Sequence, residues 1–212
     1  MRPIFITGIG TGVGKTVTAA IITEALQADY WKPVQTGLEE GTDANTIQTL
    51  LSNTNSRVFD EVYRLHLPAS PHIAAKEENV VIDTDKILAR YQQLQKDSDL
   101  MIVEGAGGLL VPLNDDEFIL HLAKKLNAKV ILVSRNYLGS INHSLLTAAV
   151  CKQHNIDVIG WMFNDQFQGY EEDIVRWSGY PKIGSVQQAG TVSRSFVAEQ
   201  AAAVRSSLQA LL

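Results

Sequence analysis

The chain has 212 residues, of which 45% are hydrophobic, so it is long enough to bury one sizeable core. We expect residues 1–212 to form a single domain. The formal net charge of -5 leaves no excess of positive potential, which argues against nucleic acid or an acidic membrane surface as a partner. Cys151 is the only cysteine, which excludes an intrachain disulfide and predicts a reducing, cytoplasmic location. We expect neither a secretory leader nor a membrane-spanning segment.

Short apolar runs rich in β-branched residues alternate along the chain with longer segments of helical period. This alternation is typical of strands joined by crossover helices. It predicts an α/β fold in which a doubly wound, mostly parallel sheet lies between flanking helices as a three-layer sandwich. The predicted strands cover residues 3–7, 30–34, 100–104, 129–134, 157–163 and 182–186.

Three segments place apolar side chains on one helical face, and we expect those faces to contact the sheet rather than a partner protein. The faces consist of Ile87, Leu88, Tyr91 and Leu94 in the first segment, Leu145, Leu146, Ala149 and Val150 in the second, and Val197, Ala201, Val204, Leu208 and Leu211 in the third.

The first predicted strand is followed by a glycine-rich loop, Gly8-Ile9-Gly10-Thr11-Gly12-Val13-Gly14-Lys15-Thr16, which opens a predicted helix. Glycines let backbone amides approach phosphate oxygens, and the helix N-terminus adds positive potential. Lys15 would reach the outer phosphates and the Thr16 hydroxyl would hold magnesium. The leading glycine is one residue farther from Gly14 than in the phosphate-loop consensus. A dinucleotide-binding fingerprint fails, because Lys15 stands where its third glycine should be.

Glu104 ends an apolar run, Leu100-Met101-Ile102-Val103, and is followed by glycine-rich residues 105–108. Nucleotide enzymes of this kind place a magnesium-holding carboxylate at the end of such a strand. We therefore predict that Glu104 contributes to a metal site.

Lys32 lies inside the second predicted strand, beside Pro33, which cannot donate a ladder hydrogen bond. Lys32 is either a solvated edge lysine or, with the Gln35-Thr36-Gly37 turn, faces the same crevice as Lys15, because ligands gather at the carboxyl ends of parallel strands. Asp43 is either a helix N-terminal residue favoured by the helix dipole or a further magnesium contact. The sequence leaves both alternatives open.

The five histidines show no metal-ligand or catalytic-triad spacing, so we interpret most of them as surface or packing residues. Cys151 lies beside Val150 within helical period, which is typical of a small buried hydrophobic residue rather than a nucleophile.

Six motifs occur in order along residues 1–165. They are Thr-Gly-x-x-Thr-x-Val-Gly-Lys-Thr at 7–16, Lys-Pro-Val-x-Thr-Gly at 32–37, Ser-Pro-His-Ile-Ala at 70–74, Val-Glu-Gly-Ala-Gly-Gly at 103–108, Leu-Gly-x-Ile-Asn-His at 138–143, and Asn-Asp at 164–165. Together they resemble the dethiobiotin synthetase family of phosphate-loop NTPases, which shares the long loop spacing.

The resemblance implies a magnesium-dependent ligase that converts diaminopelargonic acid, carbon dioxide and ATP to dethiobiotin, ADP and phosphate in biotin synthesis. One amine captures carbon dioxide as a carbamate, the carbamate attacks the γ-phosphate, and the second amine closes the ring by expelling phosphate. The resemblance implies that Lys15 neutralises the transferring phosphoryl group and that Lys32 binds the carbamate and its phosphate. Thr11 is implied as a further catalytic residue, and Thr36 as a substrate contact.

The resemblance also implies that Thr16, Asp43 and Glu104 are the magnesium ligands and that Asn164 reads the adenine edge. Asn142 belongs to a block that, in the family, holds the distant carboxylate of the substrate across a two-fold interface, so a homodimer with substrate near the interface is implied. The implied ATP-binding residues are Gly12, Val13, Gly14, Lys15, Thr16, Val17, Asp43, Glu104, Gly105, Ala106, Gly107, Asn164 and Asp165.

The chain departs from the family pattern in two places. Gly10 and Gly12 stand where relatives can carry acidic residues, and after Gly184 the chain has Ser185-Val186-Gln187-Gln188 in place of a proline-containing segment that closes over adenine. The alternative function is a nucleotide-switched partner ATPase of the partitioning or iron-protein type, but such proteins typically carry an additional lysine early in the loop, where this chain has Ile9 and Gly10.

Overall fold

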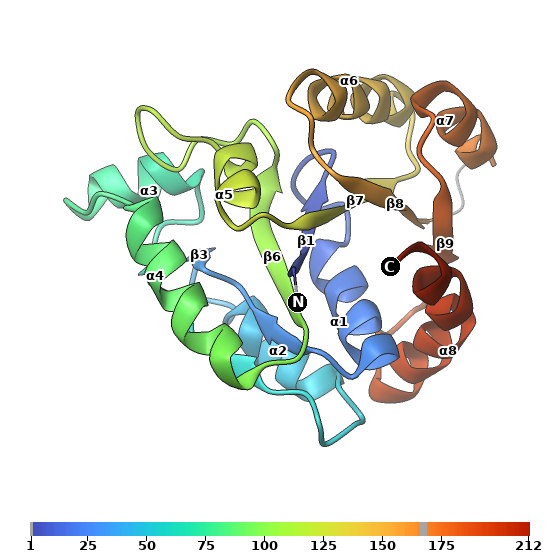
Figure 1. The fold of residues 1–212 in the computed structure, drawn as a ribbon, viewed down its shortest axis with the longest axis horizontal. Helices are drawn as coiled ribbons and strands as arrows, with labels where there is room; N and C mark the ends of the chain where they lie inside the picture. The colour runs from blue at the N-terminus through green and yellow to red at the C-terminus, as the bar shows by residue number, and fades with distance from the viewer. Residues whose placement is uncertain (1, 166–168) are drawn as a thin grey trace.

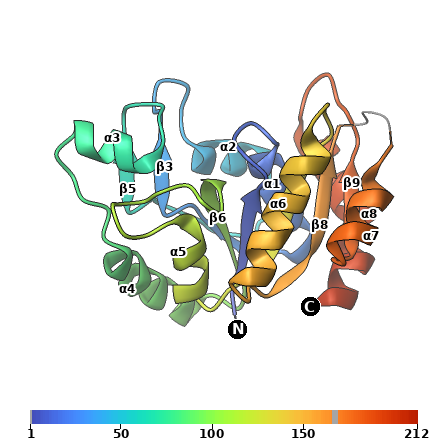
Figure 2. The same ribbon diagram turned by 90° about the horizontal axis from the view of Figure 1, so that it is seen from above.

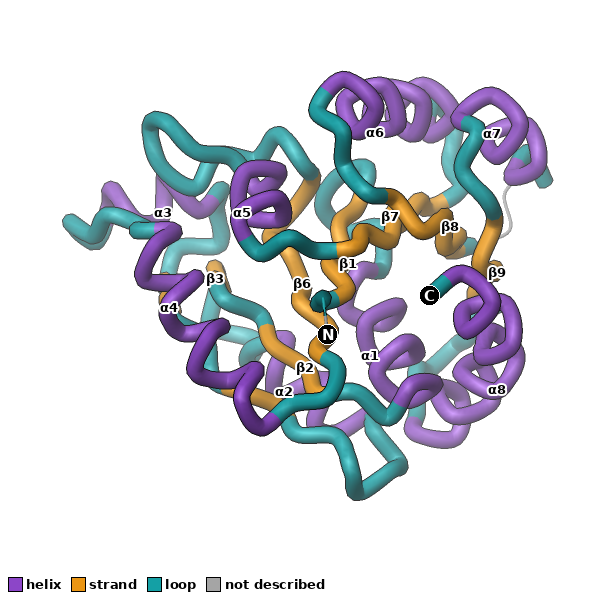
Figure 3. The backbone as a smooth tube through the Cα atoms, viewed as in Figure 1, coloured by secondary structure: helices purple, strands orange, loops and turns teal. Residues whose placement is uncertain are grey.

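The computed structural model describes residues 2–165 and 169–212. A seven-stranded parallel sheet lies between two layers of helices (Figures 1 and 3). The strands in spatial order are β4 (Val58–Phe59), β2 (Asp29–Trp31), β6 (Met101–Gly108), β1 (Ile4–Gly8), β7 (Lys129–Arg135), β8 (Val158–Asn164) and β9 (Lys182–Val186). This arrangement confirms the predicted doubly wound α/β fold.

Helices cover both faces of the sheet (Figure 1). One layer contains α1 (Lys15–Leu26), α2 (Asp43–Leu50) and α8 (Arg194–Leu211), and the other contains α4 (Thr84–Leu94), α5 (Ile119–Lys125), α6 (Ser140–Gln153) and α7 (Glu171–Ser178), with a 3-10 turn η1 (Gln95–Asp97) after α4. Ile4 and Ile6 pack against the first layer and Phe5 against the second, because successive residues of a strand point to opposite faces. Among the described residues, no helix is long and apolar enough to cross a membrane.

The predicted strand over residues 30–34 is wrong in one respect, because the structure divides it into two strands. β2 ends at Trp31 in the main sheet, and β3 (Val34–Thr36) pairs with β5 (Tyr63–Leu65) in a separate two-stranded parallel sheet. The chain leaves the main sheet at Lys32 and Pro33, where the ring nitrogen of Pro33 has no proton to donate to a ladder. Figure 2 shows β3, β5 and the short helix α3 (Pro71–Glu77) beside one another at one end of the molecule.

The predicted apolar face of α6 is also wrong. The structure buries the opposite set, Ser140, Ser144, Ala148 and Cys151, and leaves Leu146 57% exposed. The hydroxyl groups of Ser134 on β7 and Ser144 lie 3.0 Å apart and share a hydrogen bond. Small side chains allow this close approach of helix and strand, so Leu146 points away from the sheet, while Val150 of the predicted face is half-buried and packs against the core.

The other predicted helical faces and the role of Cys151 are confirmed. Ile87, Tyr91 and Leu94 of α4 are buried and Leu88 is half-buried. On α8, the buried residues are Val197, Ala201, Val204 and Leu208, with Leu211 half-buried. Cys151 is buried, and this burial raises the pKa of its thiol to about 12, as expected for a packing residue.

Candidate active site

The phosphate loop connects β1 to α1 at the carboxyl edge of the sheet, where β1 lies between β6 and β7. Gly12 and Gly14 have φ values of 71° and 86°, a left-handed conformation that glycine adopts without strain. A Cβ atom at Gly14 would lie 2.4 Å from Nδ2 of Asn164, so the loop packs closely against the end of β8. No side chain caps α1, and an anion at this helix end would be stabilised by backbone N–H groups and the helix dipole.

Lys15 is the first residue of α1 and is only 8% exposed. Its Nζ donates a hydrogen bond of 2.9 Å to the carbonyl oxygen of Gly10, so the ammonium group folds back against the loop. Burial lowers the pKa of Lys15, against the opposing attraction of Glu104 and Asp43. A cation held against the phosphate loop has the placement that a polyphosphate requires.

Thr16 and two carboxylates form a cluster of oxygen atoms. The Thr16 hydroxyl lies 2.9 Å from Oδ1 of Asp43 and 3.0 Å from Oε1 of Glu104, while the Tyr30 hydroxyl donates to Oε2 of Glu104 at 2.8 Å. Burial raises the pKa of Glu104, although Lys32 and the Tyr30 hydrogen bond oppose that shift. A hydroxyl and two carboxylates are oxygen donors of the kind that Mg²⁺ prefers. In the described part of the chain, no group of three or more His, Cys, Asp or Glu side chains forms a separate metal cluster.

Lys32 lies in the connection between β2 and β3 and is 7% exposed, so it is not a solvated edge lysine. Its Nζ forms an ion pair with Asp43 and lies 3.6 Å from Oε1 of Glu104. Burial alone would lower the pKa of Lys32, but attraction to the two carboxylates outweighs it and the pKa is raised. The ammonium group therefore stays charged and faces the same cavity as Lys15.

A cavity of about 710 Å³ opens above these residues. It gathers twelve of the residues expected from the sequence, which are Thr11, Gly12, Gly14, Lys15, Thr16, Val17, Lys32, Thr36, Asp43, Glu104, Ala106 and Gly107. Gln35, from the turn expected to face this crevice, also lines it. Ser70 and Pro71 belong to a motif that had no assigned role, and Pro68, Ala69 and Val111 were not expected from the sequence. Tyr30 was also missed, although its place two residues before Lys32 on the preceding strand was a usable signal.

A second cavity of about 240 Å³ lies on the other side of the phosphate loop and shares Gly12, Gly14 and Val17 with the first. Val13, Asn164 and Asp165 line it, together with residues 186–189, Val192 and Phe196. Nδ2 of Asn164 donates to the carbonyl oxygen of Val13 at 2.6 Å, so this side chain also anchors the loop. Arg135, which sequence reasoning missed, donates to Oδ2 of Asp165 at 2.5 Å.

Two expected site residues lie outside both cavities. Gly105 is buried inside β6, which is longer than predicted, and a Cβ atom there would lie 2.7 Å from the ring of Phe5. Asn142 is exposed near the start of α6 and lines neither cavity. Within one copy of the chain, the structure does not bring Asn142 to the phosphate loop.

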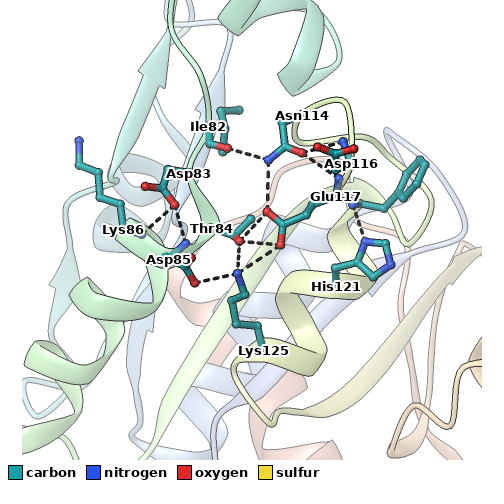
Figure 4. Close-up of polar contacts among 11 residues, drawn as sticks. Ile82, Asp83, Thr84, Asp85, Lys86, Asn114, Asp116, Glu117, His121 and Lys125 are labelled. Carbon is teal, nitrogen blue, oxygen red and sulfur yellow. Dashed lines mark hydrogen bonds and ion pairs between the residues drawn. The ribbon is translucent and has the colours of Figure 1, made fainter.

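A polar network holds the loop that follows β6 (Figure 4). The same loop carries Val111, which lines the cavity. The Glu117 carboxylate accepts hydrogen bonds from the hydroxyl of Thr84 at 2.7 Å and from the amide of Asn114 at 3.2 Å, and pairs with Lys125 at 3.2 Å. The network joins this loop to the start of α4 and the end of α5. It fixes one wall of the cavity.

The fold and the loop define a phosphate-loop nucleotide-binding protein with a lysine-rich, oxygen-lined cavity. A family model described as an AAA domain matches residues 2–195. The chain is 47% identical over 198 residues to the ATP-dependent dethiobiotin synthetase BioD of Cytophaga hutchinsonii, which covers 93% of this chain and 94% of that protein. It is 43% identical over 191 residues to the protein of the same name from Christiangramia forsetii, with coverage of 90% and 87%. The chain belongs to the dethiobiotin synthetase family of ATP-dependent ligases.

Solved structures with the same fold include ATPases of a different kind. The cell division ATPase MinD of Pyrococcus furiosus matches with a TM-score of 0.63 and 14% identity, over 100% of this chain and 98% of that one. A ParA family ATPase from Chlorobium tepidum matches with a TM-score of 0.58 and 15% identity, over 99% and 93%. At this identity the likeness concerns the fold alone.

Proposed function

We propose that residues 1–212 form one ligase domain that converts 7,8-diaminopelargonic acid, carbon dioxide and ATP to dethiobiotin, ADP and phosphate. The observation that carries the proposal is the single cavity in which Lys15, Lys32, Thr16, Asp43 and Glu104 converge beside the phosphate loop. Membership of the dethiobiotin synthetase family supports the choice of substrates. The use of ATP fits a cytoplasmic enzyme.

In this proposal the phosphate loop positions the triphosphate, with Lys15 exchanging its bond to the Gly10 carbonyl for a phosphate oxygen. Lys32 binds the carbamate that forms on one amine of the substrate and the phosphate transferred to it. Thr11 and Thr36, which line the same cavity, contribute hydroxyl groups to the reacting centre. Catalysis is then mostly positioning and electrostatic stabilisation of the charge that spreads over the phosphoryl oxygens.

Thr16, Asp43 and Glu104 would hold Mg²⁺, and their three oxygen donors fit that ion. When bound, Mg²⁺ supplies positive charge to the phosphate oxygens. Lys32 pairs with Asp43 and Glu104 in the structure, so its ammonium group balances their negative charge inside the cavity. Asn164 and Asp165, in the adjoining cavity, would bind the base of the nucleotide.

We also propose that the enzyme is a homodimer. Leu146, Leu110 and Leu138 are 57%, 54% and 87% exposed, and an apolar groove of about 350 Å³ runs between α6 and the loop after β6. Asn142 lies on the same helix, from which it would reach the distant carboxylate of a substrate bound by the partner subunit.

The test is phosphate release from ATP with magnesium and bicarbonate, with and without diaminopelargonic acid, together with mass detection of dethiobiotin. The ligase function is supported if phosphate release requires the diamine and if one phosphate is released for each dethiobiotin formed. Slow release that is indifferent to the diamine would instead indicate a nucleotide-switched ATPase.

A further inference from the structure

The reaction proposed above leaves one proton without a named acceptor. When the neutral amine forms an N–C bond with carbon dioxide, one N–H bond must break to leave a carbamate. The titratable side chains that line the cavity, among the described residues, are Lys15, Lys32, Asp43 and Glu104. The two carboxylates already accept from Thr16 and pair with Lys32, and the Lys15 ammonium group donates to the carbonyl oxygen of Gly10. A neutral base has to reach the cavity from elsewhere.

Ser70 provides such a connection, because it lines the cavity and its Oγ lies 3.0 Å from Nδ1 of His72. Ser70 precedes α3 at the N-cap position, where a serine hydroxyl usually accepts a hydrogen bond from the helix backbone. Thr42, Asp83 and Ser193 do so at the starts of their helices, but the Ser70 side chain does not. Its hydroxyl is therefore directed to the imidazole instead of to the helix.

The surroundings of His72 suit a proton acceptor that exchanges with solvent. The imidazole is half-buried, and α3 packs against β3 and β5, which carry Tyr63 and the exposed Arg64 as titratable groups. On α3 itself, Lys76 and Glu77 are exposed, and Glu78 at its end accepts from the backbone N–H of His66. Histidine is the side chain most often used as a general base.

We propose that Ser70 and His72 form a proton relay that accepts the amine proton during carbamate formation. The amine lone pair forms the N–C bond, and one C=O π bond of carbon dioxide becomes the carboxylate. The amine proton passes to Oγ of Ser70 while the Ser70 hydroxyl proton passes to Nδ1 of His72, which carries its own proton on Nε2. The products are a carbamate, an unchanged serine and an imidazolium that returns its proton to water. This inference rests on the proposed ligase function.

The experiment compares wild type with Ser70→Ala, His72→Ala and the double variant, with His66→Ala as the matched control. His66 lies on the same segment, but its side chain is 83% exposed and does not line the cavity. Dethiobiotin formation is measured from mildly acidic to alkaline pH, with and without added imidazole, and Mg-ATP affinity is measured separately. We expect each single variant to lose about 10²-fold in kcat, which is typical of general base catalysis.

The supporting result has three parts. The double variant loses no more than either single variant, because the two side chains act as one unit. Added imidazole restores part of the turnover of His72→Ala. In Ser70→Ala and His72→Ala, the fall in activity toward acidic pH differs from that of the wild type, while the affinity for Mg-ATP stays unchanged. The inference is overturned if the variants keep the kcat and the pH profile of the wild type, or if only the KM for the diamine rises. It is also overturned if kcat falls but imidazole restores no turnover and the pH profile of the activity stays unchanged. Failure of the wild type to form dethiobiotin would instead reject the proposed function.

Discussion

Lys32 forms ion pairs with Asp43 and Glu104 at the wall of the cavity. A buried charge without a partner costs several kcal/mol, so the buried ammonium group of Lys32 depends on these two carboxylates. The two carboxylates also raise the pKa of Lys32 against the effect of burial. The Lys32 ammonium group is therefore a positive charge that an anionic intermediate in the cavity could meet.

Lys32→Ala is expected to lower kcat by at least about 10²-fold, because in the proposed mechanism it removes the positive charge that binds the carbamate and the phosphate transferred to it. The measurement is diamine-dependent phosphate release, with folding checked by circular dichroism. Lys96→Ala is the control, since Lys96 is exposed in η1 and should change turnover little. Near-normal turnover in a folded Lys32→Ala variant would remove Lys32 from the mechanism.

Gly14→Ala and Gly10→Ala form a matched pair within the phosphate loop. Alanine at 14 must adopt a φ of 86° and would place Cβ 2.4 Å from Asn164, which costs about 1–2 kcal/mol in backbone strain alone. A Cβ atom at Gly10 meets no atom within 4 Å. We expect calorimetric titration to give at least about tenfold weaker ATP binding for Gly14→Ala and a near-normal value for Gly10→Ala. Equal affinities in both variants would contradict the tight packing of the loop against β8.

At the scale of elements, the network around Glu117 ties the loop after β6 to α4 and α5 (Figure 4). Burial would raise the pKa of Glu117, but hydrogen bonds from Thr84, Asn114 and Lys125 outweigh it and lower the pKa. A carboxylate whose pKa is lowered by folding contributes stability above its unfolded pKa, which is about 4.3 for glutamate. That contribution is lost as the pH falls through the lower, folded value.

Glu117→Gln should therefore reduce the free energy of unfolding by about 1–2 kcal/mol at neutral pH, with a smaller difference in acid. Thermal unfolding of both proteins at several pH values measures this difference. Glu199→Gln, on the exposed side of α8, is the control and should change the melting temperature little at any pH. A loss of stability in Glu117→Gln that is the same at neutral and acidic pH would contradict the assigned role of the carboxylate.

At the scale of the whole molecule, the exposed face of α6 is the candidate surface for association. Leu146→Glu would place a charge in this apolar face, and we expect dimer dissociation to become at least about tenfold easier, or about 1.4 kcal/mol. Analytical ultracentrifugation over a range of concentrations measures this change. Val81→Glu is the control, because Val81 is 76% exposed but lies before α4, away from that groove. A wild-type chain that remains monomeric at all concentrations would remove the dimer from the proposal.

The sequence by itself determined the local features of this protein. The first, third, fourth, fifth and sixth predicted strands, the phosphate loop and the faces of α4 and α8 all follow from residue patterns within a few turns of chain. These features depend on the backbone preferences of glycine and proline and on the alternation of apolar side chains, which act over short distances. The convergence of Lys15 and Glu104 on one cavity was also foreseeable, because the carboxyl ends of parallel strands share one edge of the sheet.

Only the tertiary structure decided which distant segments meet. The Tyr30 hydroxyl donates a hydrogen bond to Glu104, which is 74 residues away in the sequence. Ser70 lines the cavity, and it follows β5, which pairs with β3 in a second sheet outside the main one. The orientation of α6 was decided in the same way, since Ser144 and Ala148 fit closely against β7 where Leu146 would not. Periodicity identifies which side chains are apolar, but the space left by the facing element determines which of them are buried.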